Sequence, residues 1–202
     1  MSIEFYDRNS ESFFAQTVSA DMSAAQNRFL QHVPRGGRIL DAGCGSGRDA
    51  KAFVGQGYEV EAFDASAEMV RLAAAHTGLP IRQMTFQDMQ WNRYFDGIWA
   101  SASLLHVPRA ELPGIMSKFK RALRPGGMWY VSFKHGASDR DKDGRHFTDM
   151  TEEALRTELK AMQDLEVVEI WVSEDVRPNR ASEFWLSGLI RRVASASSLE
   201  ES

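Results

Sequence analysis

The chain of 202 residues contains only one cysteine, Cys44. A single thiol cannot form an internal disulfide, and the five histidines do not have the spacing of a structural zinc site. This composition indicates a reducing compartment and no resident metal. We therefore expect a cytoplasmic protein.

Long apolar runs and an excess of positive charge are also absent. No run of 18 apolar residues is free of charge, and residues 1–12, MSIEFYDRNSES, contain no apolar signal segment. Lys and Arg number 24 against 28 Asp and Glu, so the formal net charge is −4. Because such a chain has no general attraction to phosphate backbones, we expect neither a nucleic-acid partner nor a membrane partner.

What the chain does contain is an alternation of β-like and helix-like segments. Its length and its 43% hydrophobic content suffice for one main core. From residue 37, segments such as GRILDA and YEVEAFDAS alternate with helical ones such as AEMVRLAAAH, which is the pattern of βαβ units. We expect a helical lid segment over 1–34, a domain over 35–194 and a disordered tail over 195–202. The polar stretch KHGASDRDKDGRHFT predicts a mobile loop after a strand.

The stretch ILDAGCGSGRDA, residues 39–50, places alternating glycines between a predicted strand and a predicted helix. It lacks the lysine of a triphosphate-binding loop. Arg48 stands where the dinucleotide fingerprint GxGxxG requires its third glycine, which weakens a nicotinamide or flavin interpretation without excluding it. Asp41, just before the first glycine, would repel a pyrophosphate and attract an ammonium or sulfonium group. The loop therefore favours a cationic ligand close to the backbone.

Two more acids follow predicted strands. Asp64 ends the second strand, where a carboxylate can accept the hydroxyl groups of a ribose. Asp88 follows the third strand; its carboxylate could accept the exocyclic amine of adenine, and Met89 could offer its backbone N–H. Since open α/β sheets bind ligands at the carboxyl ends of their strands, this row of acids predicts a nucleoside-containing ligand.

Five segments occur in an order that resembles the motifs of the class I S-adenosylmethionine-dependent methyltransferases. They are LDAGCGSG, AFDAS, FQDM, FDGIWASASLLHVP and LRPGGMWYVSFK, roughly within residues 39–134. The segments DGRHFT and VVEIWVSED also resemble small bacterial tellurite-resistance-like and small-molecule methyltransferases. The resemblance implies a three-layer αβα Rossmann-like fold with a seven-stranded, mostly parallel sheet and one antiparallel strand. It also implies S-adenosyl-L-methionine as cofactor and S-adenosyl-L-homocysteine as product.

The same resemblance implies which residues hold the cofactor. They are Asp41, Gly43, Cys44, Gly45, Gly47, Asp64, Ala65, Met69, Asp88 and Met89. The loop residues would hold the methionine part, Asp64 the ribose, and Asp88 with Met89 the adenine.

On the acceptor side, His106 in SLLHVP is the candidate catalytic base, with local backbone bonding as the alternative. Tyr6, Lys134, Arg145 and Arg177 are candidate substrate contacts, with core packing or a solvated surface as alternatives. The predicted function is methyl transfer to a small-molecule acceptor, with a tellurite- or selenite-like oxyanion or a thiol as candidates. The alternative is a non-catalytic S-adenosylmethionine-binding sensor or partner subunit. We expect a monomer or a homodimer.

Overall fold

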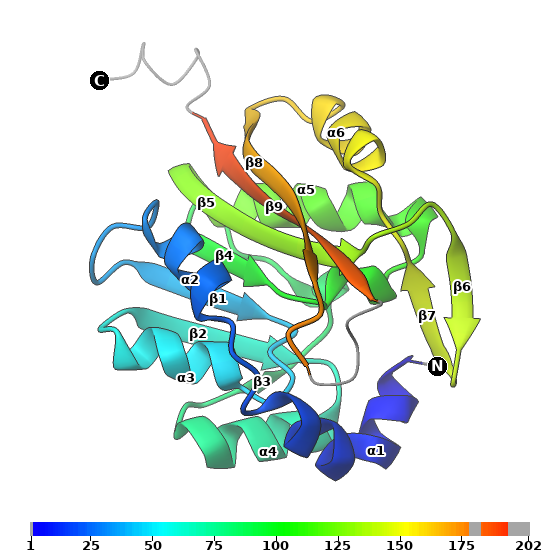
Figure 1. Cartoon of the computed structure of the whole chain (residues 1–202). Helices are drawn as coiled ribbons and strands as arrows, with labels where there is room; N and C mark the ends of the chain where they lie inside the picture. The colour runs from blue at the N-terminus through cyan, green and yellow to red at the C-terminus, as the bar shows by residue number, and fades with distance from the viewer. Residues whose placement is uncertain (1, 178–182, 194–202) are drawn as a thin grey trace.

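A seven-stranded sheet forms the centre of the molecule (Figure 1). The computed structural model describes residues 2–177 and 183–193. The strand order is β3-β2-β1-β4-β5-β9-β8; neighbouring strands from β3 to β5 are parallel, and β9 runs antiparallel to both β5 and β8. The strands are β1 (Arg38–Ala42), β2 (Glu59–Asp64), β3 (Arg82–Gln83), β4 (Phe95–Ala100), β5 (Leu123–Lys134), β8 (Leu165–Glu174) and β9 (Phe184–Arg192). This confirms the predicted fold class.

Helices cover both faces of the sheet because each apolar strand face needs a partner layer. They are α1 (Ser2–Thr17), α2 (Ser23–Leu30), α3 (Arg48–Gly55), α4 (Ala67–Thr77), α5 (Leu112–Ala122) and α6 (Glu152–Lys160). Short 3-10 turns are η1 (Phe86–Asp88), η2 (Leu104–His106) and η3 (Arg109–Glu111). Local sequence sets helix ends: Ser66 accepts a hydrogen bond from the Met69 amide at the start of α4, and Gly78 ends α4 in the left-handed conformation.

Buried apolar side chains pack against both faces of the sheet. On one face, Phe29 of α2 and Phe53 of α3 pack with Trp99, which stacks on Tyr130 at 3.8 Å between ring centres. On the other face, side chains of α5 and α6 such as Phe119 pack against β4 and β5. This packing leaves the carboxyl ends of the parallel strands as one continuous edge.

The polar stretch predicted as a mobile loop is instead a β-hairpin. Its strands are β6 (Asp139–Lys142) and β7 (Arg145–Thr148), paired antiparallel. The connecting residues Asp143 and Gly144 have φ values of 53° and 75°. A two-residue hairpin turn needs positive φ at both positions, which is why an Asp-Gly pair is preferred there. The polar composition of the stretch predicted a loop although it contains this turn pair.

Two other predictions differ from the structure or lie outside the described residues. The third strand, which the sequence predicts before Asp88, spans only Arg82–Gln83. The predicted tail 195–202 lies outside the described residues. Within those residues, no helix combines the length and the apolar character that crossing a membrane requires.

Candidate active site

A cavity of about 1080 Å³ lies at the carboxyl ends of β1, β2, β4 and β5. Its other walls come from α1, the start of α2, the β6–β7 hairpin and the segments at the ends of β8 and β9. Small-molecule sites have volumes of roughly 300–1,000 Å³. This cavity can therefore hold a nucleoside-sized ligand together with a second small molecule.

The glycine loop after β1 is held in a shape that side chains would prevent. Gly43 and Gly47 have φ values of 77° and 74°. A Cβ on Gly43 would lie 2.6 Å from the Ser103 Cβ, and one on Gly47 would lie 2.7 Å from the Thr77 Cγ2. The first glycine thus lets β1 approach the turn after β4, and the third lets α3 approach α4. Gly43 lines the cavity, whereas Gly47 supports the loop from behind.

Asp41 places a buried carboxylate in the wall of the cavity. Its Oδ2 accepts a hydrogen bond from the Ala50 amide at 3.1 Å, and no ion pair with a cationic side chain is found for it in the described part of the chain. Burial, and secondly the nearby Asp49, raise the pKa of Asp41 well above its usual value. A carboxylate desolvated in this way fits a ligand that carries a positive charge.

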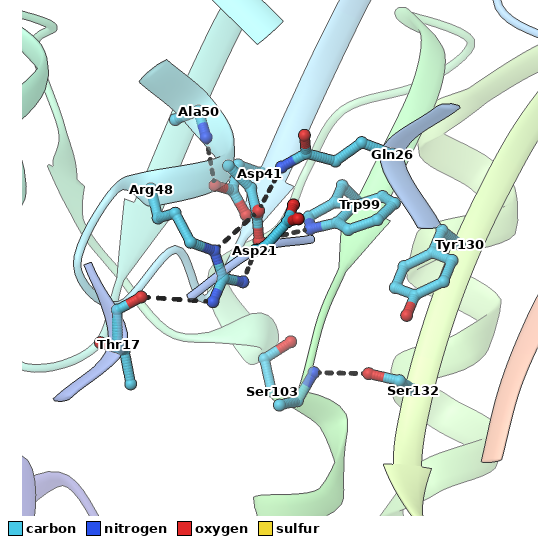
Figure 2. Close-up of polar contacts among 12 residues, drawn as sticks. Thr17, Asp21, Gln26, Asp41, Arg48, Ala50, Trp99, Ser103, Tyr130 and Ser132 are labelled. Atoms are coloured by element: carbon cyan, nitrogen blue, oxygen red, sulfur yellow. Dashed lines mark hydrogen bonds and ion pairs between the residues drawn. The ribbon is translucent and has the colours of Figure 1, made fainter. Parts of the chain in front are cut away.

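Asp49, which sequence reasoning missed, organises a buried polar cluster beside the glycine loop. Its carboxylate accepts hydrogen bonds from the Gln26 Nε2 at 2.7 Å, the Trp99 Nε1 at 2.9 Å and the Arg48 Nη2 at 2.6 Å. Figure 2 shows Gln26, Trp99 and Arg48 converging, and Arg48 also reaches the carbonyl oxygen of Thr17. The cluster therefore ties α2 and the end of α1 to the loop. Gln26 and Trp99 lie too far from Asp49 in the sequence for spacing to reveal the cluster.

Asp64 is held at the end of β2 by backbone amides. Its Oδ2 accepts from the Gly45 amide at 2.9 Å and its Oδ1 from the Ser66 amide at 3.0 Å. Burial raises the pKa of Asp64, and these hydrogen bonds oppose that rise. Cys44, Ala65 and Met69 line the same part of the cavity, as the sequence predicted for the cofactor side.

The structure does not bring Asp88 and Met89 to the cavity wall. The Asp88 carboxylate turns back to accept from the backbone amide and the hydroxyl of Thr85, at 2.8 and 2.7 Å, and Met89 is buried in the core. Among the described residues, Phe86 and Gln87 of the η1 turn line the cavity in their place. Asp88 is turned away from the cavity because its carboxylate caps its own 3-10 turn.

His106 is held in one tautomer on the acceptor side. Its Nδ1 lies 2.7 Å from the carbonyl oxygen of His146, so Nδ1 must carry the proton and donate it. The Nε2 therefore accepts from the Tyr6 hydroxyl, also at 2.7 Å. Burial lowers the pKa of His106 to about 4. A neutral imidazole with an orienting carbonyl on one nitrogen is the arrangement of a general base.

The predicted substrate residues Tyr6, Lys134, Arg145 and Arg177 all line the cavity. The Lys134 ammonium forms an ion pair with Glu183 and lies 4.0 Å from the centre of the Trp185 ring. Arg177 forms two side-chain hydrogen bonds with Asp175, at 2.9 and 2.5 Å. Arg145 contacts the aromatic rings of Phe5 and Phe147. Tertiary structure thus gathers cations from β5, β7 and the end of β8 around Tyr6.

Known proteins resemble this chain in sequence and in fold. Residues 39–127 match the family model of a methyltransferase domain. A ubiquinone biosynthesis O-methyltransferase of Xylella fastidiosa (strain 9a5c) is 33% identical over 104 residues, which are 48% of this chain and 42% of that protein. An S-adenosyl-L-methionine-dependent Diels-Alderase of Talaromyces variabilis is 33% identical over 105 residues, 47% of this chain and 35% of that protein. The match thus spans less than half the length of these curated relatives.

A solved structure shares the fold over nearly the whole chain. It is the 1,6-didemethyltoxoflavin-N1-methyltransferase of Burkholderia thailandensis, crystallised with 1,6-didemethyltoxoflavin and S-adenosylhomocysteine. The TM-score is 0.75 with 24% identity, and the alignment covers 95% of this chain and 85% of that one.

Proposed function

We propose that the protein is a class I S-adenosylmethionine-dependent methyltransferase that transfers a methyl group from S-adenosylmethionine to a small-molecule acceptor, and the match of residues 39–127 to a methyltransferase domain supports this. Such an enzyme needs a pocket that holds a cationic nucleoside cofactor beside a second ligand. The cavity at the strand ends meets that requirement in size and in its acidic wall. We also propose that the protein works in the cytoplasm.

The observation that carries this proposal is the pair of acids beside the glycine loop, of which Asp41 is buried and Asp64 is half-buried. Asp41 would face the positive charge of the cofactor, and Asp64, oriented by the Gly45 and Ser66 amides, would accept its ribose hydroxyl groups. The loop glycines leave room for the methionine part, while Phe86 and Met69 offer apolar walls to the adenosine. The residues present therefore fit the cofactor.

When bound, the cofactor supplies an activated methyl group on a sulfonium leaving group. The protein's task is then to align the acceptor and to exclude water, since no strong catalytic group is needed to break the bond. α1 and the β6–β7 hairpin supply walls on the acceptor side.

The pairing of Tyr6 with His106 favours an acceptor that loses a proton, such as a hydroxyl or an amine. A proton leaving the acceptor can pass to the Tyr6 oxygen as Tyr6 gives its own proton to the His106 Nε2. The His146 carbonyl, which binds Nδ1–H, would stabilise the resulting imidazolium. The curated O-methyltransferase and the N-methyltransferase structure among the comparisons have names consistent with such acceptors.

A tellurite- or selenite-like oxyanion, or a thiol, is the second candidate acceptor. Lys134, Arg145 and Arg177 in the wall favour an anion, and a soft anion would need no base. A rate loss of about 100-fold in His106→Gln would identify an acceptor that needs the base, and a much smaller loss would identify a soft anion.

Titration of S-adenosylhomocysteine into the purified protein tests the cofactor half of the proposal. We expect Asp64→Ala to weaken its binding about tenfold or more, because hydrogen bonds to a charged group are lost. Asp88→Ala is the matched control: it removes a carboxylate that caps the η1 turn outside the cavity, so the affinity should stay within about twofold of wild type.

Release of S-adenosylhomocysteine from S-adenosylmethionine, measured with phenols, amines, thiols, selenite and tellurite, tests the transfer itself. Binding without release on any acceptor would favour a non-catalytic S-adenosylmethionine-binding role. Binding of NADH in place of S-adenosylhomocysteine would contradict the proposal altogether.

A further inference from the structure

Arg145 differs from the other arginines that line the cavity. Arg28, Arg48, Arg140 and Arg177 each form an ion pair with a carboxylate: Glu169, Asp49, Asp149 and Asp175, respectively. For Arg145, the nearest described carboxylate oxygen is Oδ2 of Asp143, which lies 3.7 Å from Nη2 on a side chain that is 61% exposed. This ion pair is therefore the longest of the five, and the buried Nε of Arg145 still lacks a hydrogen-bond partner, so the guanidinium can take up a further anionic partner.

The guanidinium of Arg145 contacts two aromatic rings. Its Cζ lies 4.1 Å from the ring centre of Phe5 and 5.1 Å from that of Phe147. Its side chain is only 20% exposed, and its buried Nε has no hydrogen-bond partner. Stacking leaves the edge of the planar fork as the face open to a ligand. An oxyanion at that edge would compensate a cation that has lost much of its hydration.

This position lies next to the base inferred above. Burial raises the pKa of the Tyr6 phenol; Arg145, through its charge and a side-chain hydrogen bond, opposes that rise, and Arg177 opposes it more weakly. Tyr6 donates to the His106 Nε2, and its ring lies 4.9 Å from that of Phe13, whose edge approaches Gly45 of the cofactor loop. A molecule anchored at Arg145 would therefore have its other end between Tyr6 and the cofactor loop.

Two segments distant in sequence build this position together. Phe5 and Tyr6 come from α1, whereas Arg145 and Phe147 come from β7, and the Ser2 hydroxyl accepts a hydrogen bond from the His146 amide at 3.1 Å. Figure 1 shows the N-terminal end of α1 beside β7. The stacked arginine exists only while these two elements are in contact.

We propose that Arg145, stacked between Phe5 and Phe147, binds an oxyanionic group of the methyl acceptor, so that the acceptor is an anion and its binding holds α1 against the β6–β7 hairpin. This inference rests on the proposed function, because it assigns a subsite within the same cavity. The oxyanion is either a carboxylate of an organic acceptor or a free inorganic oxyanion. Both offer the oxygen pair that a guanidinium fork recognises.

Calorimetry on the protein saturated with S-adenosylhomocysteine tests this subsite. The probes are 4-hydroxybenzoate, its neutral counterpart 4-hydroxybenzyl alcohol, and selenite. For an organic acceptor we expect 4-hydroxybenzoate to bind about tenfold or more tightly than the alcohol, and Arg145→Gln to remove that difference. Selenite binding that depends on Arg145, without binding of 4-hydroxybenzoate, would support the subsite and identify a free oxyanion as its ligand.

Arg156→Gln is the matched control, since it removes one positive charge that pairs with Glu152 on the exposed face of α6, outside the cavity. It should change 4-hydroxybenzoate affinity by no more than about twofold. If Arg145→Gln does not fold, Phe5→Leu, which removes one stacking ring from α1, should still weaken 4-hydroxybenzoate binding several-fold.

Two results would overturn the inference. One is equal binding of 4-hydroxybenzoate to wild type and Arg145→Gln; the other is no binding of either anion up to about 5 mM. In both cases retained S-adenosylhomocysteine binding would leave the proposed function intact. Loss of S-adenosylhomocysteine binding in the wild type would instead count against the proposed function.

Discussion

The Asp41 carboxylate has opposite effects on ligand binding, which it favours, and on the stability of the ligand-free protein, which it lowers. Burial, and then the charge of Asp49, raise the pKa of its carboxyl group well above the unfolded value. For a raised carboxyl pKa, stability is fully present below the unfolded pKa and is lost as pH rises through the folded pKa. At a pH above the unfolded pKa, ionisation of Asp41 is therefore less favourable in the ligand-free folded protein than in the unfolded chain, and this destabilises the fold. A bound cationic ligand would restore that stability.

Asp41→Asn should accordingly stabilise the ligand-free protein at pH 7 and weaken ligand binding. The asparagine oxygen can still accept from the Ala50 amide, so the fold is kept. We expect the Tm to rise by about 2–4 °C for each kcal/mol regained, while S-adenosylhomocysteine affinity falls about tenfold or more. Thermal unfolding and calorimetry at pH 7 measure the two effects.

Asp49→Asn is the control, and we expect it to lower the stability of the ligand-free protein rather than raise it. The Asp49 carboxylate neutralises the largely buried Arg48, so its removal should destabilise the protein by about 3–5 kcal/mol. Equal Tm values for the Asp41 variant and wild type would contradict the role given to Asp41.

The lowered pKa of His106 predicts how the activity depends on pH. Because burial lowers its pKa to about 4, the imidazole stays neutral and able to accept a proton down to about pH 5. We expect kcat/KM to stay constant above about pH 5 and to decrease at lower pH, because protonation of His106 removes the base. An inflection near the ordinary histidine value of about 6.5 would contradict this assignment.

The same shift affects folding stability. A lowered histidine pKa contributes stability that is present above about pH 6.5 and is lost as pH falls toward about 4, in all about 3 kcal/mol. His106→Gln should lose correspondingly less stability over this window, which denaturant unfolding at several pH values measures.

Among the elements, α1 depends on polar contacts to its neighbours at several points. Besides the contacts of Ser2 and Tyr6, the Asp7 Oδ1 accepts from the Ser66 hydroxyl at 2.6 Å, at the start of α4. The helix covers the cavity between the cofactor loop and the hairpin. We propose that it acts as a lid that must loosen for ligand exchange.

Asp7→Ala should therefore speed opening of α1. We expect faster proteolysis within residues 2–17 and S-adenosylhomocysteine dissociation accelerated about fivefold to tenfold, because a charge-assisted hydrogen bond is lost. Glu11→Ala on the same helix is the control: its ion pair with Arg71 is exposed, and such pairs contribute about 0–1 kcal/mol. Identical behaviour of the two variants would contradict a specific latch at Asp7.

The β6–β7 hairpin is an element that the sequence did not predict. Its polar residues have the composition of a loop, yet Asp143 and Gly144 make a tight turn and the strands pair. The first strand, β6, is exposed along its whole length, so it has no hydrophobic alternation that would indicate the pairing.

At the scale of the whole molecule, the parallel order of β3, β2, β1, β4 and β5 collects residues from separate motifs at one edge. The carboxyl ends of parallel strands point the same way, so Asp41 and Asp64 meet there although a helix separates them in sequence. The antiparallel β9 then brings Trp185 to the same cavity as Lys134. The fold thus joins a cofactor wall and an acceptor wall in one cavity.

The sequence by itself determined the alternation of strands and helices, the glycine loop and the acids Asp41 and Asp64, because these depend on local periodicity and on motif order. Tertiary structure alone decided the Asp49 cluster, the tautomer of His106 and the stacking of Arg145 on Phe5. Each of these joins residues far apart in the chain, and side-chain partners across such distances are set by packing, which no local pattern encodes. The position of Asp88 also became clear only from the structure, because the hydrogen bonds that its carboxylate accepts from Thr85 show that it caps its own turn.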